Sequence, residues 1–266
     1  MKHLLLSELY RLKKNKGIFV TFILAIVFSF ISPLFITVGL ALLETMINVE
    51  SLDFYGINQF CSILAGGSLI SIIMFFTISS YSNDDFKFRT VQNKIISGYS
   101  RKKIFFAKLI INVSASVVIL VIYALLSLLF SSLFLGFNKE STFTMTSLTN
   151  ILLLLLCAIL IQITTYTLLT TINVIAQKNT KTLIWFVLIN IFISIISSTL
   201  IDILNELELY SWVNLIQDML PEMQLMYIGL NLLNIDLIIL IVVTNLIYTL
   251  IITLIGYSSF KTKELK

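Results

Sequence analysis

The stretch AKLIINVSASVVILVIYALLSLLFSSLFLG, residues 107–136, is apolar over nearly its whole length and carries one charged residue, Lys108, close to its start. A helix that rises about 1.5 Å per residue needs roughly 20 apolar residues to cross a membrane core about 30 Å thick. This stretch is therefore long enough to span a membrane. Of the whole chain, 58% is hydrophobic and 12% is charged, with a mean hydropathy of +1.00. Because soluble domains do not have this composition, the sequence predicts an all-α integral membrane protein.

Six apolar stretches in the chain are long enough to span a membrane. They cover residues 17–43, 60–81, 107–136, 148–175, 182–204 and 235–258. The polar segments between them are too short to form a separate soluble domain, so we expect one transmembrane domain over residues 1–266. The first stretch is also too long for the cleaved apolar region of a signal peptide, which spans about 7–15 residues, so we expect it to remain as span one.

The basic residues fall almost entirely on one side of this six-span arrangement. Seventeen of the 18 lie before span one, in or next to the loop 82–106, between spans four and five, or after span six, and only Lys139 lies on the other side. The positive-inside rule places the basic side in the cytoplasm, together with both termini. This bias accounts for most of the net charge of +4. We expect contact with anionic membrane lipid and no nucleic-acid site.

The sequence also lacks the residue patterns of several kinds of chemistry. The interiors of the six spans hold no acidic, basic or histidine residue, whereas proton-driven pumps need such groups. Cys61 and Cys157 lie within apolar stretches, and His3 is the single histidine, so we expect no metal site. No nucleophile elbow and no Walker phosphate loop occurs. We therefore expect a chain with no catalytic residues and no cofactor of its own.

Span four has the highest density of neutral polar residues. Gln162, Tyr166 and Asn173 lie near one helical face, with Thr170 beside them. These four residues are candidates for lining a substrate path. The alternative interpretation is hydrogen bonding between helices, which polar residues in membranes commonly provide. In span two, Gly66 and Gly67 indicate close packing of helices.

The residues before span one have the pattern of an amphipathic helix. In KHLLLSELYRLKKNK, residues 2–16, the leucines Leu5, Leu9 and Leu12 fall on one face, while Glu8 and Arg11 fall on others. Such a helix can lie in the headgroup layer of a membrane. We expect an elbow-like helix over residues 1–16.

The loop between spans two and three, residues 82–106, has a helical pattern as well. Residues 83–110 read NDDFKFRTVQNKIISGYSRKKIFFAKLI, and four apolar residues recur there at helical spacing, namely Phe88, Val91, Ile95 and Ile96. Gly98 then interrupts the pattern, and Ser100 can cap a helix that begins at Arg101. A short amphipathic helix between two spans fits a groove on a soluble partner. A solvated basic loop is the alternative.

Several positions of this loop carry a resemblance to a known family, namely Asp85, Thr90, the pair Ser100–Arg101 and Lys108. The chain resembles the type-2 ABC exporter permeases, particularly the small six-span subunits of Gram-positive bacteria. Their loop has an acidic residue, a Gly-Thr pair, a short apolar helix, a Ser-Arg pair and a lysine that opens the next span. Arg89 stands where glycine is usual, and Gly98 where proline is frequent. The resemblance extends from the N-terminal helix to the basic tail after Phe260.

This resemblance implies a coupling helix near residues 85–97 that contacts a separate ABC ATPase subunit, which holds ATP and Mg. It also implies that two permease chains, identical or related, form the translocation path in a bacterial cytoplasmic membrane. ATP-driven closure of the ATPase subunits would then move the spans between inward-facing and outward-facing states. The implied partner-binding residues are Asp85, Phe88, Arg89, Thr90, Val91, Ile95, Ser100 and Arg101.

An apolar interior without fixed charge suits export of a peptide, an antimicrobial or a lipid-like amphiphile, as in antimicrobial peptide resistance. The alternative function is that of a non-transporting assembly or sensor subunit that binds a cytoplasmic partner. The outer loop, residues 205–234, contains Tyr210, Trp212 and Tyr227 and resembles a pair of short interfacial helices. These aromatic residues are typical of membrane anchoring, and gating is the alternative.

Overall fold

The computed structural model describes residues 1–47, 55–66, 69–138 and 145–263. These residues form eleven α-helices and contain no strand, which confirms the predicted all-α class. The helices are α1 (Lys2–Lys14), α2 (Lys16–Ile47), α3 (Gly56–Leu64), α4 (Leu69–Lys87), α5 (Thr90–Ile96), α6 (Arg101–Leu135), α7 (Met145–Ala176), α8 (Asn179–Glu206), α9 (Tyr210–Met219), α10 (Pro221–Gly229) and α11 (Ile235–Thr262).

Five helical segments of the described chain are long and apolar enough to cross a membrane. They are Lys16–Gly39, Arg101–Leu135, Ser147–Ala176, Asn179–Glu206 and Ile235–Thr262. Large apolar side chains on their outer faces are exposed, for example Phe192 on α8 and Ile239 on α11. Helices with apolar outer faces are stable in lipid, where their backbone hydrogen bonds are satisfied internally. The chain is therefore a multi-pass membrane protein.

The predicted second span, residues 60–81, is not one continuous helix in the structure. The helix α3 ends at Leu64, and α4 begins at Leu69. Gly66, which the sequence places in a packed helix interface, has a φ of +78°. Because an α-helix cannot continue through this left-handed conformation, the helix is interrupted at Gly66. The apolar composition of the stretch is the same whether the helix is straight or broken.

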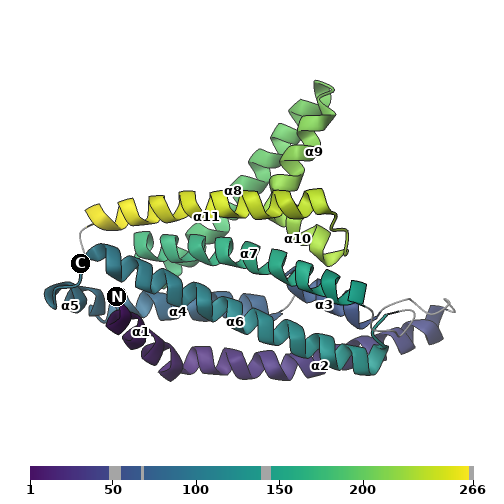
Figure 1. Ribbon diagram of the computed structural model, residues 1–266, viewed down its shortest axis with the longest axis horizontal. Helices are drawn as coiled ribbons and strands as arrows, with labels where there is room; N and C mark the ends of the chain where they lie inside the picture. The colour runs from purple at the N-terminus through teal and green to yellow at the C-terminus, as the bar shows by residue number, and fades with distance from the viewer. Residues whose placement is uncertain (48–54, 67–68, 139–144, 264–266) are drawn as a thin grey trace.

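The long helices α2, α6, α7 and α11 lie alongside one another, as Figure 1 shows, with contacts between α2 and α6, α6 and α7, and α7 and α11. Their shared core includes the buried side chains of Phe60, Tyr123, Leu154 and Leu169. The helices α1 and α5 and both chain ends lie at the same end of the bundle (Figure 1). The helix α8 leaves the bundle, and it therefore exposes much apolar surface. The shorter helix α9 runs back along the projecting part of α8.

The start of α3 approaches the backbone of α6 very closely. A Cβ atom added at Gly56 would lie 2.8 Å from the backbone nitrogen of Ser132 and 2.9 Å from its Cα. The amide of Gly56 also donates a hydrogen bond of 2.9 Å to the carbonyl of Gly136. Because backbone atoms of a long helix cannot move aside as a flexible side chain does, this contact requires glycine.

We expect Gly56→Ala to lower the stability of the folded protein by about 1–3 kcal/mol, because the added methyl group overpacks this contact. Gly39→Ala is the matched control. A Cβ at Gly39 meets nothing within 4 Å, so the same change inside α2 should raise stability by up to about 1 kcal/mol. Thermal unfolding in detergent measures both effects, and equal shifts for the two variants would contradict the close approach.

Candidate functional site

The helix α1 buries a different face from the one its leucines predict. Leu4 and Glu8 are buried, whereas Leu9 is exposed. Leu5 and Leu12, which the sequence assigns to a face that can lie in the headgroup layer, are partly buried and pack against the core. Glu8, which the pattern assigns to a polar face, turns inward because cationic side chains from distant parts of the chain surround it. This position of Glu8 defines the site.

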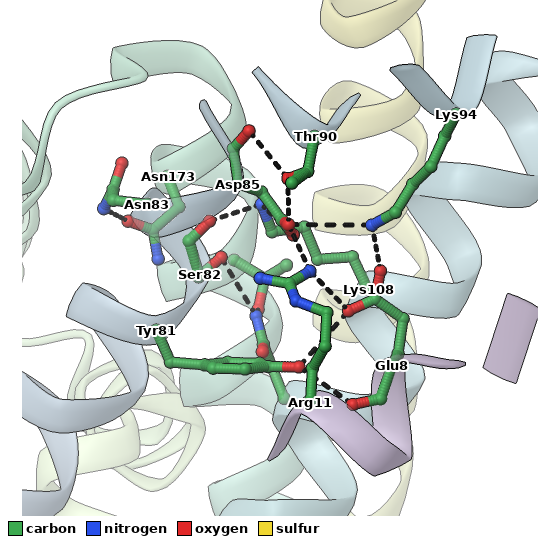
Figure 2. Close-up of polar contacts among 12 residues, drawn as sticks. Glu8, Arg11, Tyr81, Ser82, Asn83, Asp85, Thr90, Lys94, Lys108 and Asn173 are labelled. Atoms are coloured by element: carbon green, nitrogen blue, oxygen red, sulfur yellow. Dashed lines mark hydrogen bonds and ion pairs between the residues drawn. The ribbon is translucent and has the colours of Figure 1, made fainter. Parts of the chain in front are cut away.

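Five charged side chains meet at the end of the bundle that carries α1 and α5, and we call them the charge cluster (Figure 2). Four helices supply them. The members are Glu8 and Arg11 of α1, Asp85 of α4, Lys94 of α5 and Lys108 of α6. The cluster thus joins the segment before the first apolar helix to both ends of the loop 82–106.

Asp85 is the central acceptor of the charge cluster, and its side chain is 1% exposed. One carboxylate oxygen pairs with Arg11 and lies 3.6 Å from Lys94 Nζ, and the other lies 3.3 Å from Lys108 Nζ. The Thr90 hydroxyl donates a hydrogen bond of 2.6 Å to the same carboxylate. A single anion therefore binds cations from three other helices.

Glu8 is the second anion and pairs with Lys94 and with Arg11, the latter at 3.2 Å. The Tyr81 hydroxyl donates to Glu8 Oε2 at 3.2 Å and lies 3.1 Å from the Glu8 carbonyl oxygen. Lys108 also donates to the backbone carbonyl of Ser82. These contacts satisfy the buried charges, which is the condition for such a cluster to be stable away from water.

The electrostatic balance keeps Asp85 ionised. Burial alone would raise the pKa of the Asp85 carboxyl. The charges of Lys108, Lys94 and Arg11 outweigh burial and hold this pKa well below its usual range. The ion pairs therefore persist at neutral and mildly acidic pH.

The two sides of α5 differ sharply. Val91 is 2% exposed, and Ile95 packs beside it against α1 and α6. On the outer side, Phe88 is 63% exposed and Ile96 is 83% exposed, and Arg89 is also exposed. We use the name outer surface of α5 for Phe88 and Arg89, which lie in the turn just before α5, together with Ile96, its last residue. The apolar set of four read from the sequence is thus divided between an inner and an outer face.

Ser100 and Arg101 act within the chain. Ser100 caps α6, since its Oγ accepts a 3.5 Å hydrogen bond from the amide of Lys103, at the position the sequence predicts. The Arg101 guanidinium donates to the backbone carbonyls of Phe260, Lys261 and Lys263 at the end of α11, at distances of 2.7–3.2 Å. Cations stabilise the carbonyl end of a helix, so Arg101 fixes α11 against α6.

The four candidate path residues of α7 take different positions. Thr170 and Asn173 are fully buried and bond to other helices: Asn112 of α6 donates to Thr170 at 3.2 Å, and Asn83 of α4 donates to Asn173. Tyr166 is buried in the core, and Gln162 is partly buried. The contacts of Thr170 and Asn173 are those of the alternative interpretation, hydrogen bonding between helices.

A cavity of about 320 Å³ lies instead between α7, α8, α10 and α11. Its wall is mostly apolar, with Leu168, Phe186 and Ile252, and it carries the hydroxyl groups of Thr165 and Tyr248. Thr165 lies one residue from Tyr166, on the side of α7 that faces α8 and α11. This cavity has the size and the mixed lining of a site for an amphiphile.

Sequence reasoning missed Glu8, Lys94 and the role of Asn83. Their partners lie far along the chain, 86 residues away for the pair Glu8 and Lys94, so local periodicity carries no signal for them. Among the described residues no group of three or more His, Cys, Asp and Glu side chains could hold a metal ion.

Comparison of the chain with protein-family models, with curated proteins and with solved structures found no match. The interpretation of the site therefore rests on its own geometry.

We expect Asp85→Asn to lower the stability of the protein by about 3 kcal/mol, because it leaves the buried Lys108 and the partly buried Arg11 and Lys94 with one carboxylate. The control is Asp84→Asn, one residue earlier, where the carboxylate makes no ion pair with the charge cluster. Thermal unfolding of the two variants in detergent measures the difference. A loss for Asp84→Asn as large as that for Asp85→Asn would contradict the central role of Asp85.

The effect of Asp85→Asn should also depend on pH. Because the folded pKa of Asp85 is lowered, its contribution to stability is complete above the unfolded value of about 3.9 and is lost as pH falls below that value. The stability difference between wild type and Asp85→Asn should stay constant from about pH 8 to pH 5 and shrink only below about pH 4. A difference that already falls between pH 7 and pH 5 would contradict the lowered pKa.

Proposed function

We propose that the chain is the membrane-embedded permease subunit of an ABC exporter, driven by a separate ABC ATPase subunit that binds the outer surface of α5. One observation carries the proposal. Phe88, in the turn before α5, and Ile96, the last residue of α5, are exposed, while the inner face of α5 is fixed to α1, α4 and α6 by the charge cluster and by Val91. A partner that pushes on this outer surface would therefore move several helices together.

The internal contacts of the loop support the resemblance to type-2 ABC permeases. Three of the residues that carry that resemblance meet at Asp85, which accepts a hydrogen bond from Thr90 and pairs with Lys108. Ser100 and Arg101 fix the start of α6 and the end of α11. Arg89 has a φ of +54°, a conformation that favours glycine, the usual residue of the family at this position. Gly98 has a φ of +86°, which proline cannot adopt, so this chain forms that turn differently.

In the proposed topology the membrane is crossed six times, with α3 and α4 together forming the second crossing. Both termini, α1 and α5 lie on the cytoplasmic side of a bacterial membrane, and α1 acts as an elbow helix at its surface. Two such chains, identical or related, would form the path. The shared end of α1, α5 and both termini in Figure 1 supports this arrangement.

The cargo we propose is a peptide, an antimicrobial or a lipid-like amphiphile. The cavity between α7, α8, α10 and α11 supports this choice, because it offers apolar walls with a few hydroxyl groups and a single acidic residue, Glu222, among its lining. Gln162 and Tyr166 lie on α7, which forms one wall of this cavity, and they stay candidates for the path although neither is among its lining residues.

The docking surface can be tested with the variant Phe88→Ala/Ile96→Ala. Co-expressed with the ABC ATPase subunits of the same genome, the wild-type chain should co-purify with one of them and show ATPase activity. Loss of two exposed apolar anchors should weaken binding by about 2 kcal/mol or more, roughly a thirtyfold loss of affinity. Binding and ATPase activity are measured in nanodiscs.

The matched control is Leu207→Ala/Leu230→Ala, which removes two apolar side chains outside the outer surface of α5 that are 62% and 56% exposed. This control should bind the ATPase as the wild type does. If no ATPase binds the wild-type chain, the permease proposal is overturned, and a non-transporting assembly or sensor subunit with the same docking surface takes its place.

The topology can be tested by labelling single cysteines in intact cells. We expect Glu206→Cys, at the end of α8, to react with a membrane-impermeant maleimide, and Lys102→Cys, at the start of α6, to react only after the cells are opened. The background is low because Cys61 and Cys157 are both buried. Labelling of Lys102→Cys from outside would contradict the proposed orientation.

A further inference from the structure

A polar hollow of about 570 Å³ lies beside the charge cluster, between the end of α4 and the turn that joins α7 to α8. It is distinct from the apolar cavity between α7 and α11. Its lining includes Ser80, Asn83, Asp84, Lys87, Gln177 and Lys178. A volume of this size is within the range of small-molecule sites.

Asn83 gives this hollow an unused hydrogen-bond acceptor. The residue is 5% exposed, and its Oδ1 has no hydrogen-bond partner among the described residues. The orientation of the amide is fixed, because Nδ2 donates to the backbone carbonyl of Ser79 at 3.0 Å and to Asn173 Oδ1, and it lies 3.3 Å from Thr182 Oγ1. A backbone carbonyl only accepts, so the unpaired atom is the oxygen. A buried acceptor of this kind calls for a donor from a ligand.

The remaining groups of the hollow favour an anion. Lys87 and Lys178 are exposed on its rim, and Gln177 Nε2 is a buried donor without a partner among the described residues. Lys178 is also the N-cap residue of α8 and makes no side-chain cap, so the first amides of that helix have no capping side chain. Helix N-termini with unpaired amides bind phosphate.

Asp84 is the one acidic residue of the lining, so two lysines and one carboxylate leave a net charge of +1. Inorganic phosphate carries its hydroxyl on the phosphorus itself, so one small ion would have to face the two lysines, the Asp84 carboxylate and Asn83 Oδ1 at once. A phosphodiester that also carries a hydroxyl group offers an anion to the two lysines and a hydrogen-bond donor to Asn83 Oδ1. Phe86 and Ala176 add an apolar wall beside these polar groups.

We propose that this hollow binds the headgroup of an anionic phospholipid of the phosphatidylglycerol type. The phosphodiester pairs with Lys87, Lys178 and the start of α8, and a glycerol hydroxyl donates to Asn83 Oδ1. The hollow lies at the ends of the membrane helices, where headgroups are found. The proposal does not depend on which soluble partner binds α5.

The test is native mass spectrometry of the full chain in detergent, titrated with phosphatidylglycerol. Lys87→Gln/Lys178→Gln should weaken binding of the first lipid about tenfold or more, since each basic residue contributes to the attraction of anionic lipid. The control Lys102→Gln/Lys103→Gln removes the same charge from two exposed lysines outside the hollow and should change the affinity less than about twofold. Equal losses in both variants, or no binding to wild type, would overturn the site.

Two further ligands test the chemistry without altering the fold. Phosphatidylmethanol has the same phosphodiester charge and no headgroup hydroxyl, so it should bind about fivefold more weakly than phosphatidylglycerol. Equal affinity would overturn the role of Asn83. Glycerol 1-phosphate tests the source of the phosphate. Weak competition by it supports a membrane lipid, and competition as strong as that of the lipid would overturn the assignment to the membrane in favour of a soluble phosphate ester.

Discussion

The carboxylate of Asp85, buried among Arg11, Lys94 and Lys108, is the interaction on which the end of the bundle depends. Each of these cations belongs to a different helix, so the position of α5 is fixed relative to α1 and α6. Buried ion pairs of this kind contribute little net stability compared with apolar packing, but breaking one is costly. What the cluster provides is one defined arrangement of helices that resists partial separation.

The same arrangement divides α5 into two faces with different tasks. Its inner face holds Val91 in a small apolar core with Leu4, Ile104 and Phe260, next to the charge cluster. Its outer face is left to Phe88, Arg89 and Ile96. In the proposed permease, a force applied to the outer face would reach α6 through the apolar contacts of Val91 and through Asp85 of α4, which links Lys94 of α5 to Lys108 of α6. A helix with both faces solvated could not transmit such a force.

The sequence predicts those parts of the fold that lipid itself imposes. The long apolar runs appear as α2, α6, α7, α8 and α11, because any membrane-spanning segment must satisfy its backbone within a helix. The cap at Ser100 was also predictable, since it depends on residues only three apart. The break at Gly66 was not, because glycine is equally common in packed helix interfaces of membranes.

The candidate site was predictable only in outline. Spacing and resemblance pointed to Asp85, Thr90 and Lys108. The sequence pattern, however, placed Glu8 on the polar face of an amphipathic helix, where it was not expected to be buried. The polar residues of α7 were visible in the sequence, but their partners were not: Asn173 meets Asn83 across 90 residues of chain, and Thr170 meets Asn112 across 58. Such pairs follow from how helices pack, which local periodicity does not contain.

The composition of the charge cluster has a consequence for depth in the bilayer. Three cations face two carboxylates, so the cluster retains one unbalanced positive charge. With the cytoplasm negative, carrying that charge outward through a potential of 100 mV would cost about 2.3 kcal/mol, apart from the cost of removing it from water. In the proposed orientation this cost therefore limits how far α1 and α6 can move along the membrane normal. This cost opposes a shift of both helices toward the outer leaflet.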